Sequence, residues 1–227
     1  MRQFQVATFD AVGTLIELVQ PPGFTYAEVA RESNLNWDGP RLQQAFRQAW
    51  RETPPPADAS GPRPDDDRSW WHELVRRTLE RAGYTPPCFD TYFDRVYQRF
   101  EHPAIWRPKS QVPEVLTHLA GTGLRLGVLS NFDRRLHRVL AHLDLARFFE
   151  HVIISSEVGA NKPSPLIFQA ALARFSVPPA GMVHVGDDAS LDGAAAALGI
   201  AAFIVGRQTL RELPAYVGRP LKEGRVT

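Results

Sequence analysis

Short apolar runs recur along the chain, and most of them are followed by a helical pattern of apolar and polar residues. This alternation of strand-like and helix-like segments is typical of a parallel sheet covered by helices. We therefore predict an α/β protein built on a parallel sheet. The five apolar runs span residues 4–9, 124–129, 152–154, 182–185 and 201–205.

Apolar residues between these runs repeat at helical spacing. Within 112–119 and 136–143 they follow the i, i+3, i+4, i+7 pattern of a helix that packs one face on the sheet. Ser164 followed by Pro165 predicts an N-cap and the first helical position of another helix. Gly199 predicts the end of the last crossover helix.

The first run is separated from the second by about 110 residues, far more than one crossover connection requires. The patterns within 16–105 are helical and include no convincing strand, so we predict an inserted all-helical cap domain. The core then comprises 1–15 and 106–227. The stretch 53–69 is rich in Pro, Asp and Gly and lacks apolar periodicity, which indicates a flexible loop. The four helical patterns span 26–34, 41–51, 70–82 and 89–100.

Composition and charge exclude several classes of protein. The formal net charge is +1 and basic residues are scattered among acidic ones, unlike the basic surface of a nucleic-acid binder. No stretch is long and apolar enough to span a bilayer, and the amino terminus resembles a strand rather than a signal sequence. Cys88, the single cysteine, excludes an internal disulfide framework. We expect a cytoplasmic protein with no nucleic-acid or membrane partner.

Polar residues follow four of the predicted strands. Asp10 ends the first run, Ser130-Asn131 ends the second, a short loop leads from the third to Lys162, and Gly186-Asp187-Asp188 ends the fourth. In a doubly wound sheet, ligands bind at the carboxyl ends of the strands. One aspartate at a strand end is common as a cap or turn residue, but four such loops together indicate an active site.

These residues resemble, in order and spacing, the four motifs of the haloacid dehalogenase superfamily. The motifs correspond to residues 9–15, 129–131, 162–163 and 186–192. The resemblance covers nearly the whole chain and implies a Rossmann-like core, with the first strand central and a helical cap inserted after it. It also implies a hydrolase in which Asp10 is the nucleophile. Three further phrases, at 46–49, 70–71 and 130–136, resemble one particular member of the family more narrowly.

The charge of a phosphoryl group defines what such a site needs. Attack by the Asp10 carboxylate requires a cation to screen repulsion and donors that hold the phosphate oxygens. Mg2+ fits hard oxygen ligands from Asp10, Asp187 and the backbone carbonyl of Val12. Asp188 and Asp192 would not bind the metal directly but would orient Lys162 or a water bound to the metal, although Asp192 is equally well explained as a helix N-cap. The predicted catalytic residues are Asp10 and Lys162, and the predicted phosphate-binding residues are Thr14, Ser130, Asn131 and Lys162.

The resemblance to the family breaks at Val12. In the phosphatases of the family, the residue two after the nucleophile is a second aspartate, which protonates the leaving group and then activates water. Valine cannot transfer a proton. General acid–base catalysis contributes about 10²–10⁴ in rate, so turnover of phosphate esters should be impaired unless another group substitutes.

Several interpretations of Val12 stay open. The chain is a phosphohydrolase that uses a good leaving group or another proton donor, a 2-haloacid dehalogenase that needs no proton donor, or a catalytically impaired protein that binds a metabolite or a partner protein. The pair Asp187-Asp188 disfavours the dehalogenase, because without a metal it would raise carboxylate pKa values around the nucleophile. A carbon–phosphorus hydrolase would need a lysine in the cap. The three lysines of the chain, Lys109, Lys162 and Lys222, all lie outside 16–105, which disfavours this interpretation.

Substrate choice should depend on the cap, because the core loops supply only generic phosphate and metal contacts. We expect a small phosphorylated metabolite as substrate. His184 lies inside an apolar strand and is best explained as a core histidine. Cap candidates for substrate contact, each also explicable as a core or surface residue, are Arg47, Trp50, Trp70, Trp71 and His72.

Overall fold

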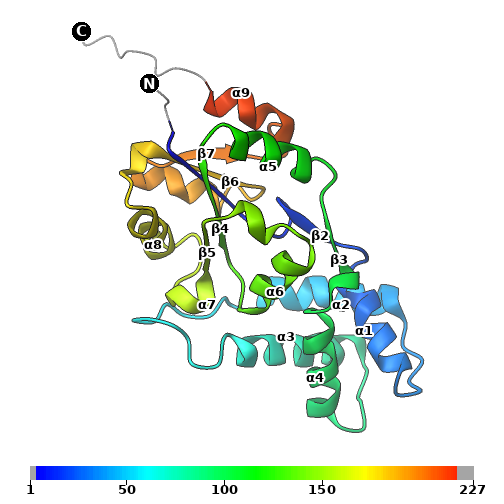
Figure 1. Cartoon of the computed structure of the whole chain (residues 1–227). Coiled ribbons are helices and arrows are strands. Elements are labelled where there is room, and N and C mark those ends of the chain that lie inside the picture. The colour runs from blue at the N-terminus through cyan, green and yellow to red at the C-terminus, as the bar shows by residue number, and fades with distance from the viewer. Residues whose placement is uncertain (1–3, 219–227) are drawn as a thin grey trace.

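A five-stranded parallel sheet forms the centre of the computed structural model, which describes residues 4–218 (Figure 1). The strand order is β5-β4-β1-β6-β7, so β1 is central, as the family resemblance implied. Each predicted apolar run forms a strand, which confirms the α/β fold. The strands are β1 (Val6–Phe9), β4 (Arg125–Ser130), β5 (His151–Ile154), β6 (Met182–Gly186) and β7 (Ala201–Ile204).

Helices cover both faces of this sheet because the side chains of β1 alternate between two apolar cores. Ala7 and Phe9 belong to the core that includes α5 and α6, whereas Val6 belongs to the core that includes α8. This is the predicted doubly wound arrangement. The α-helices here are α5 (Val112–Gly121), α6 (Arg135–His142), α7 (Ser155–Val158), α8 (Pro165–Phe175) and α9 (Leu213–Val217). Short 3-10 helices span Ala146–Phe148, Pro179–Gly181, Gly193–Leu198 and Leu210–Glu212.

Two predicted helix boundaries have the expected position but a different local structure. Ser164 precedes α8 with Pro165 at its start, yet the Ser164 hydroxyl does not cap the helix and instead donates to Asp58 at 2.8 Å. Gly199 ends the last crossover with φ of +80°, but that crossover is a 3-10 helix.

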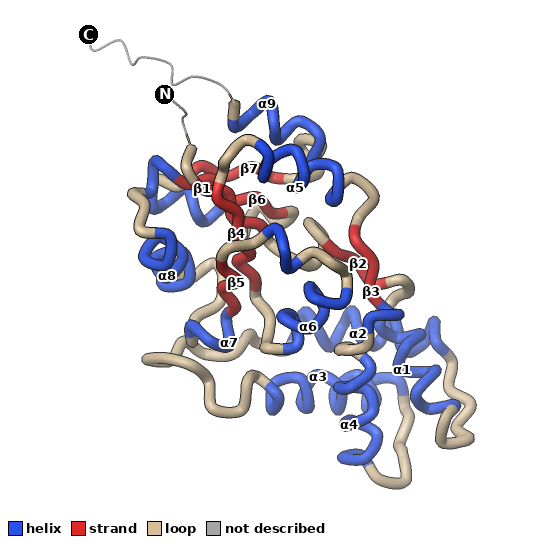
Figure 2. Tube along the Cα trace, in the orientation of Figure 1, coloured by secondary structure: helices blue, strands red, loops and turns tan. Residues whose placement is uncertain are grey.

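Four further helices come between β2 (Ile16–Leu18) and β3 (Trp106–Pro108) along the chain and lie together (Figure 2). They have their own apolar core. Tyr26, Leu42, Leu79 and Phe93 are among its buried residues. None of the helices described is long and apolar enough to cross a membrane. The four helices are α1 (Pro22–Arg31), α2 (Gly39–Glu52), α3 (Arg68–Ala82) and α4 (Phe89–Arg99), followed by a 3-10 turn at Pro103–Ile105.

A two-stranded antiparallel ribbon joins this helical region to the sheet, so the prediction of no strand within 16–105 is wrong at its first residues. Strand β2 (Ile16–Leu18) pairs with β3 (Trp106–Pro108). Three residues are too few for an alternating pattern to be detected in sequence, and the ribbon forms from a pairing across some 90 positions. The boundaries proposed for core and cap fall at this ribbon and stay a prediction.

The proline-rich loop at 54–67, which we call the strap, lies within the stretch 53–69 that was predicted to be a flexible loop. It has no helix or strand, as predicted, but it is hydrogen-bonded to the core. Its flexibility stays a prediction. The Ala59 amide donates to the Gly159 carbonyl at 2.7 Å, and the Arg63 amide donates to the Ser156 carbonyl at 2.8 Å. The partners of these bonds, Gly159 and Ser156, lie far from the strap in sequence, which is why composition alone did not reveal the contacts.

A buried ion pair supports the end of the strap. The Arg63 guanidinium bonds to the Asp67 carboxylate at 3.0 Å and to the Ser155 carbonyl at 3.1 Å. Burial raises the pKa of Asp67 to about 6, although the charge of Arg63 opposes the shift. Arg63 Nη2 and Asp67 Oδ1 have no hydrogen-bond partner among the described residues. The pair is therefore incompletely satisfied, and the bond from Arg63 to the Ser155 carbonyl joins the end of the strap to the core.

Arg135, at the start of α6, joins the core to α3 and α4. Its guanidinium bonds the buried Asp133 carboxylate through two nitrogens, at 2.8 and 2.6 Å. The same group donates to the Tyr97 carbonyl at 3.0 Å, and its central carbon lies 3.6 Å from the Tyr97 ring centroid and 5.1 Å from that of Trp71. A paired arginine thus stacks on aromatic side chains of the helical region.

Candidate active site

The Asp10 carboxylate stands at the carboxyl end of β1, where two loops bring donors to it. The Ser130 hydroxyl, at the end of β4, donates to Asp10 Oδ1 at 3.0 Å. The Lys162 ammonium donates to the same oxygen at 2.6 Å. No described residue donates a hydrogen bond to Oδ2. Two residues predicted from separate segments, Ser130 and Lys162, therefore meet at the Asp10 carboxylate.

Lys162 lies between two carboxylates and is 4% exposed. Besides Asp10, it bonds to Asp192 Oδ1 at 2.5 Å. Burial opposes the charged form, but the charges of the two carboxylates outweigh it and raise the pKa of Lys162 above its usual value. The ammonium is therefore charged throughout the physiological range.

The Asp192 carboxylate bonds to Lys162 and His184 and does not cap the helix that follows it. Its Oδ1 accepts from Lys162 and from His184 Nε2 at 3.0 Å, and its Oδ2 accepts from the Asp188 amide at 3.0 Å. Burial acts to raise its pKa, but the bonds from His184 and Lys162 prevail and hold it below its usual value. A Cβ at Gly186 would lie 2.0 Å from the Asp192 carboxyl carbon, so only glycine leaves room for this side chain.

Asp187 lies against the loop that follows Asp10. The Thr14 hydroxyl donates to Asp187 Oδ1 at 3.2 Å. Gly13 has φ of +96°, and a Cβ there would lie 2.3 Å from Asp187 Oδ2. Burial and the nearby charge of Asp10 raise the pKa of Asp187. The two carboxylates therefore repel each other, an arrangement that a bound cation would relieve.

Two predicted site residues point elsewhere. The Asn131 side chain donates to the Lys162 carbonyl at 2.9 Å and accepts from the Lys162 amide at 2.6 Å, so it holds the Lys162 loop. The Asp188 carboxylate accepts from the Ser190 amide and hydroxyl and from the Leu191 amide. The structure thus uses both side chains to shape loops rather than to reach Asp10.

Val12 is the exposed apolar residue of this loop, with 40% of its surface accessible. Its neighbour Gly13 accepts a hydrogen bond from Lys109 Nζ at 2.5 Å through the backbone carbonyl. Lys109 was missed from sequence because it lies some 96 positions away, just after β3. The small number of lysines in the sequence could have indicated Lys109, because both lysines that the structure describes contact this site.

The strap also reaches the Lys162 loop. The Asn161 side chain donates to the Pro56 carbonyl at 2.7 Å, and the Ser164 hydroxyl donates to Asp58. Residues on both sides of Lys162 are therefore tied to the inserted segment. Nothing in the local sequence of 54–67 indicates this role.

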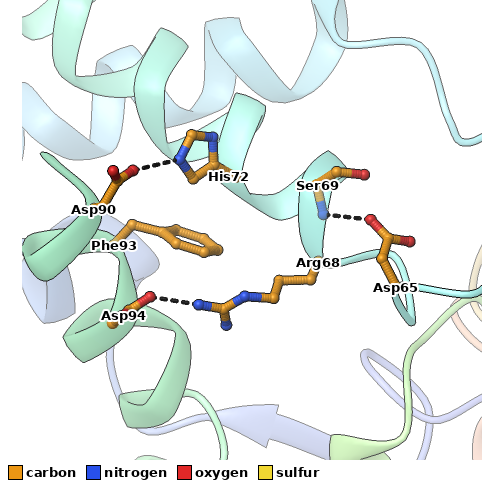
Figure 3. A pocket seen from close by; sticks show the side chains of 7 residues that line it. All are labelled: Asp65, Arg68, Ser69, His72, Asp90, Phe93 and Asp94. Atoms are coloured by element: carbon orange, nitrogen blue, oxygen red, sulfur yellow. Dashed lines mark hydrogen bonds and ion pairs between the residues drawn. The ribbon is translucent and has the colours of Figure 1, made fainter.

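An open cavity of about 400 Å³ lies elsewhere, in the helical region between α3 and α4 (Figure 3). Four of its charged groups form pairs: His72 bonds to Asp90 at 3.0 Å, and Arg68 pairs with Asp94. The fifth, the Asp65 carboxylate, accepts from the Ser69 amide at 2.9 Å. None of the residues that bond to Asp10 lines it. His72, a candidate for substrate contact, is used here to connect the two helices.

Comparison with known proteins agrees with this geometry. Residues 4–199 match the haloacid dehalogenase-like hydrolase family. Haloacid dehalogenase-like hydrolase domain-containing protein 3 is 36% identical in Mus musculus, over 89% of this chain and 82% of that protein. The Homo sapiens protein of that name is 35% identical, over 92% of this chain and 84% of that protein.

Among solved structures, the HAD-hydrolase YfnB from Bacillus subtilis, bound to magnesium, has a similar fold. It has a TM-score of 0.74 and 12% identity, over 96% of this chain and all of that one. The chain belongs to the haloacid dehalogenase-like hydrolases. The narrower resemblance predicted from the phrases at 46–49, 70–71 and 130–136 is confirmed by the two mammalian relatives.

Proposed function

We propose that this protein is a Mg2+-dependent phosphohydrolase of a small phosphorylated metabolite, acting in the cytoplasm without a nucleic-acid partner. The observation that carries the proposal is the Asp10 carboxylate held by Ser130 and Lys162 beside Asp187. A carboxylate fixed by two donors at the end of a central strand is poised to act as a nucleophile. Residues 16–105 would serve as the cap.

The proposed reaction has two steps. An Asp10 oxygen bonds to phosphorus while the bond from phosphorus to the leaving oxygen breaks, and that oxygen takes up a proton. Water then attacks the phosphorus and loses a proton to solvent while the bond between phosphorus and the Asp10 oxygen breaks, which releases inorganic phosphate and the free carboxylate. Lys162, Ser130 and Thr14 would hold the phosphate oxygens and offset their charge.

The oxygen atoms at this site suit a magnesium ion. Asp10, Asp187 and the Val12 carbonyl would provide hard ligands, and Mg2+ commonly binds through one or two carboxylates and keeps several waters. The raised pKa of Asp187 supports the assignment, because two adjacent carboxylates favour a cation between them. When bound, the ion would neutralise charge on the phosphoryl group.

Val12 favours a second candidate function. Because this apolar side chain is exposed at the nucleophile and cannot transfer a proton, the protein is alternatively a catalytically impaired member that binds a metabolite or a partner protein. A 2-haloacid dehalogenase is the third possibility to be tested. Its reaction expels halide and would not require Mg2+.

The test compares acetyl phosphate, which has a good leaving group, with glycerol phosphate, which has a poor one, and with 2-chloropropionate, each with and without Mg2+. The proposal predicts Mg2+-dependent hydrolysis of acetyl phosphate in preference to glycerol phosphate. Val12→Asp should raise glycerol phosphate turnover by about 10²–10⁴, whereas the matched control Val12→Asn should not. Asp10→Asn should abolish both activities.

Three outcomes separate the candidates. Phosphate hydrolysis that survives Asp10→Asn contradicts the nucleophile assignment. Chloride release that is independent of Mg2+ establishes the dehalogenase instead. Binding of phosphate and Mg2+ by the wild type without turnover, together with activity in Val12→Asp, establishes the binding protein.

A further inference from the structure

His184 occupies a fully buried position in β6, two residues before the end of the strand at Gly186. Its Nδ1 lies 3.0 Å from the Thr8 hydroxyl of β1, and its Nε2 lies 3.0 Å from Asp192 Oδ1. The other side chains of β6 before Gly186, including Val183 and Val185, are apolar. A polar ring at this position therefore needs an explanation other than core packing.

The partners of His184 determine its protonation state. Asp192 is an anion and can only accept hydrogen bonds, so Nε2 must carry the proton that bridges them. Burial, together with the charge of Lys162, keeps the imidazole neutral and its pKa below the usual value, although Asp192 opposes this shift. A neutral ring with a proton on Nε2 has an acceptor at Nδ1. The Thr8 hydroxyl must then be the donor to Nδ1.

These bonds form one buried chain from the central strand to the nucleophile. Thr8 orients His184, His184 donates to Asp192, Asp192 accepts from Lys162, and Lys162 donates to Asp10. Each member is at most 8% exposed. Water therefore cannot readily replace a missing member, and a change at one end should affect the other.

We propose that His184 is a positioning residue for the nucleophile, which acts by fixing the Asp192 carboxylate in the orientation that holds Lys162 against Asp10. The inference deepens the proposed phosphohydrolase function and rests on it for its catalytic consequence. The position of Lys162 can be tested without any activity, because loss of the His184 donor should loosen Lys162 whether or not the protein is an active enzyme.

The reason lies in how Asp192 is held. Lys162 and His184 both donate to Oδ1, whereas the Asp188 amide donates to Oδ2. Of these three donors, only His184 is a side chain that belongs to a strand of the sheet. Without it, the carboxylate can rotate about its last bond, and the contact with a flexible lysine side chain loses its fixed direction.

Two matched pairs of variants test the proposal. His184→Phe preserves an aromatic ring but removes both nitrogens, whereas His184→Gln keeps an N–H donor near the position of Nε2. Thr8→Val removes the hydroxyl at nearly constant shape, whereas Thr8→Ser retains it. Thermal unfolding of each variant establishes that it is folded before any other measurement is interpreted.

The first readout is the acylation rate of Lys162 by acetic anhydride, followed by mass spectrometry without Mg2+ or substrate. The chain has three lysines, so the modified peptides are readily separated, and Lys109 serves as the internal reference. We expect faster acylation of Lys162 relative to Lys109 in His184→Phe, and near wild-type rates in His184→Gln. Equal ratios in folded His184→Phe and wild type would overturn the proposal.

The second readout is the tautomer of His184 from nitrogen-15 NMR of the imidazole. The expected result for the wild type is a neutral ring with its proton on Nε2 at pH 7. A proton on Nδ1, or an imidazolium at this pH, would contradict the hydrogen-bond chain. This result stands whether or not the protein hydrolyses a phosphate ester.

The third readout is catalytic. Loss of a residue that orients a contact group typically lowers activity 10- to 100-fold, so we expect His184→Phe to lower kcat by about that factor with little change in KM. Thr8→Val should lower kcat by about fivefold, since it removes one hydrogen bond. Unchanged kcat in an active, folded His184→Phe would refute the catalytic consequence. A wild type without turnover, combined with the expected acylation ratios, would instead refute the proposed function and retain the positioning role.

Discussion

Replacement of Arg135 by methionine should separate the contribution of the contact between the core and the helical region α1–α4 from that of the surface charges around it. Arg135→Met leaves Asp133 fully buried without its guanidinium partner. Removing one member of a buried ion pair costs about 3–5 kcal/mol, because the remaining charge is uncompensated. The lost stacking on Tyr97 and Trp71 contributes to the same total, about 2 kcal/mol where a cation is desolvated.

A loss of about 3–5 kcal/mol is a large part of the 5–15 kcal/mol typical of folded domains. It corresponds to a fall in Tm of about 6–20 °C for a chain of this length. Urea unfolding at pH 7, followed by tryptophan fluorescence, measures it directly, since Trp71 lies beside Arg135. Arg135→Lys should lose less, because it keeps the charge but not the two-nitrogen contact or the stacking.

The neighbouring Arg134 provides the matched control. Its side chain is half exposed and pairs with Glu157 at 3.2 Å. Surface pairs of this kind contribute little, so Arg134→Met should change the free energy of unfolding by no more than about 0.5 kcal/mol. If Arg135→Met loses under about 1 kcal/mol, or no more than the Arg134 variant, the Arg135–Asp133 pair is not the desolvated contact that the structure indicates.

Two further predictions concern the strap. Gly159→Ala should destabilise the protein by about 1–3 kcal/mol in urea unfolding, because φ is +82° and the new Cβ would lie 2.1 Å from the Gly61 carbonyl oxygen. Gly121→Ala, where nothing lies within 4 Å, is the control and should be neutral or slightly stabilising; equal losses would refute the close approach. Because the folded-state pKa of Asp67 is raised to about 6, the native state binds the extra proton, so this residue should contribute about 1 kcal/mol more stability at pH 5 than at pH 7. Subtracting the pH dependence of Asp67→Asn isolates that contribution, and no difference between the two curves would contradict the raised pKa.

Local patterns were sufficient to predict the sheet, the four inserted helices and the loops that converge on Asp10. The apolar runs are long enough to mark β1 and β6, and polar residues at strand ends need only the parallel topology to place them together. The role of Asp192 could not be assigned from sequence alone, because an aspartate is equally suited to cap a helix and to contact Lys162. The structure favours the contact, because Gly186 has no side chain and leaves room for the Asp192 carboxylate.

Other features depend on contacts between distant parts of the chain and left no local pattern. The ribbon of β2 and β3 is three residues long on each side, too short for periodicity to be detected. Lys109 and His184 each bond to a residue that is remote in sequence. His184 was predicted as a core histidine, and it is buried with both ring nitrogens bonded, but its partners connect it to Asp10.

The strap gives the inserted region an attachment to the core besides the ribbon. The ribbon carries the chain out and back, whereas the strap joins the core beside Lys162. A hinge movement about the ribbon alone would pull on the strap, so separation of the helical region from the core would break the hydrogen bonds of the strap. We therefore expect exchange of substrate and product to be paced by detachment of this loop, and the Lys162 loop to be disturbed each time the enzyme opens.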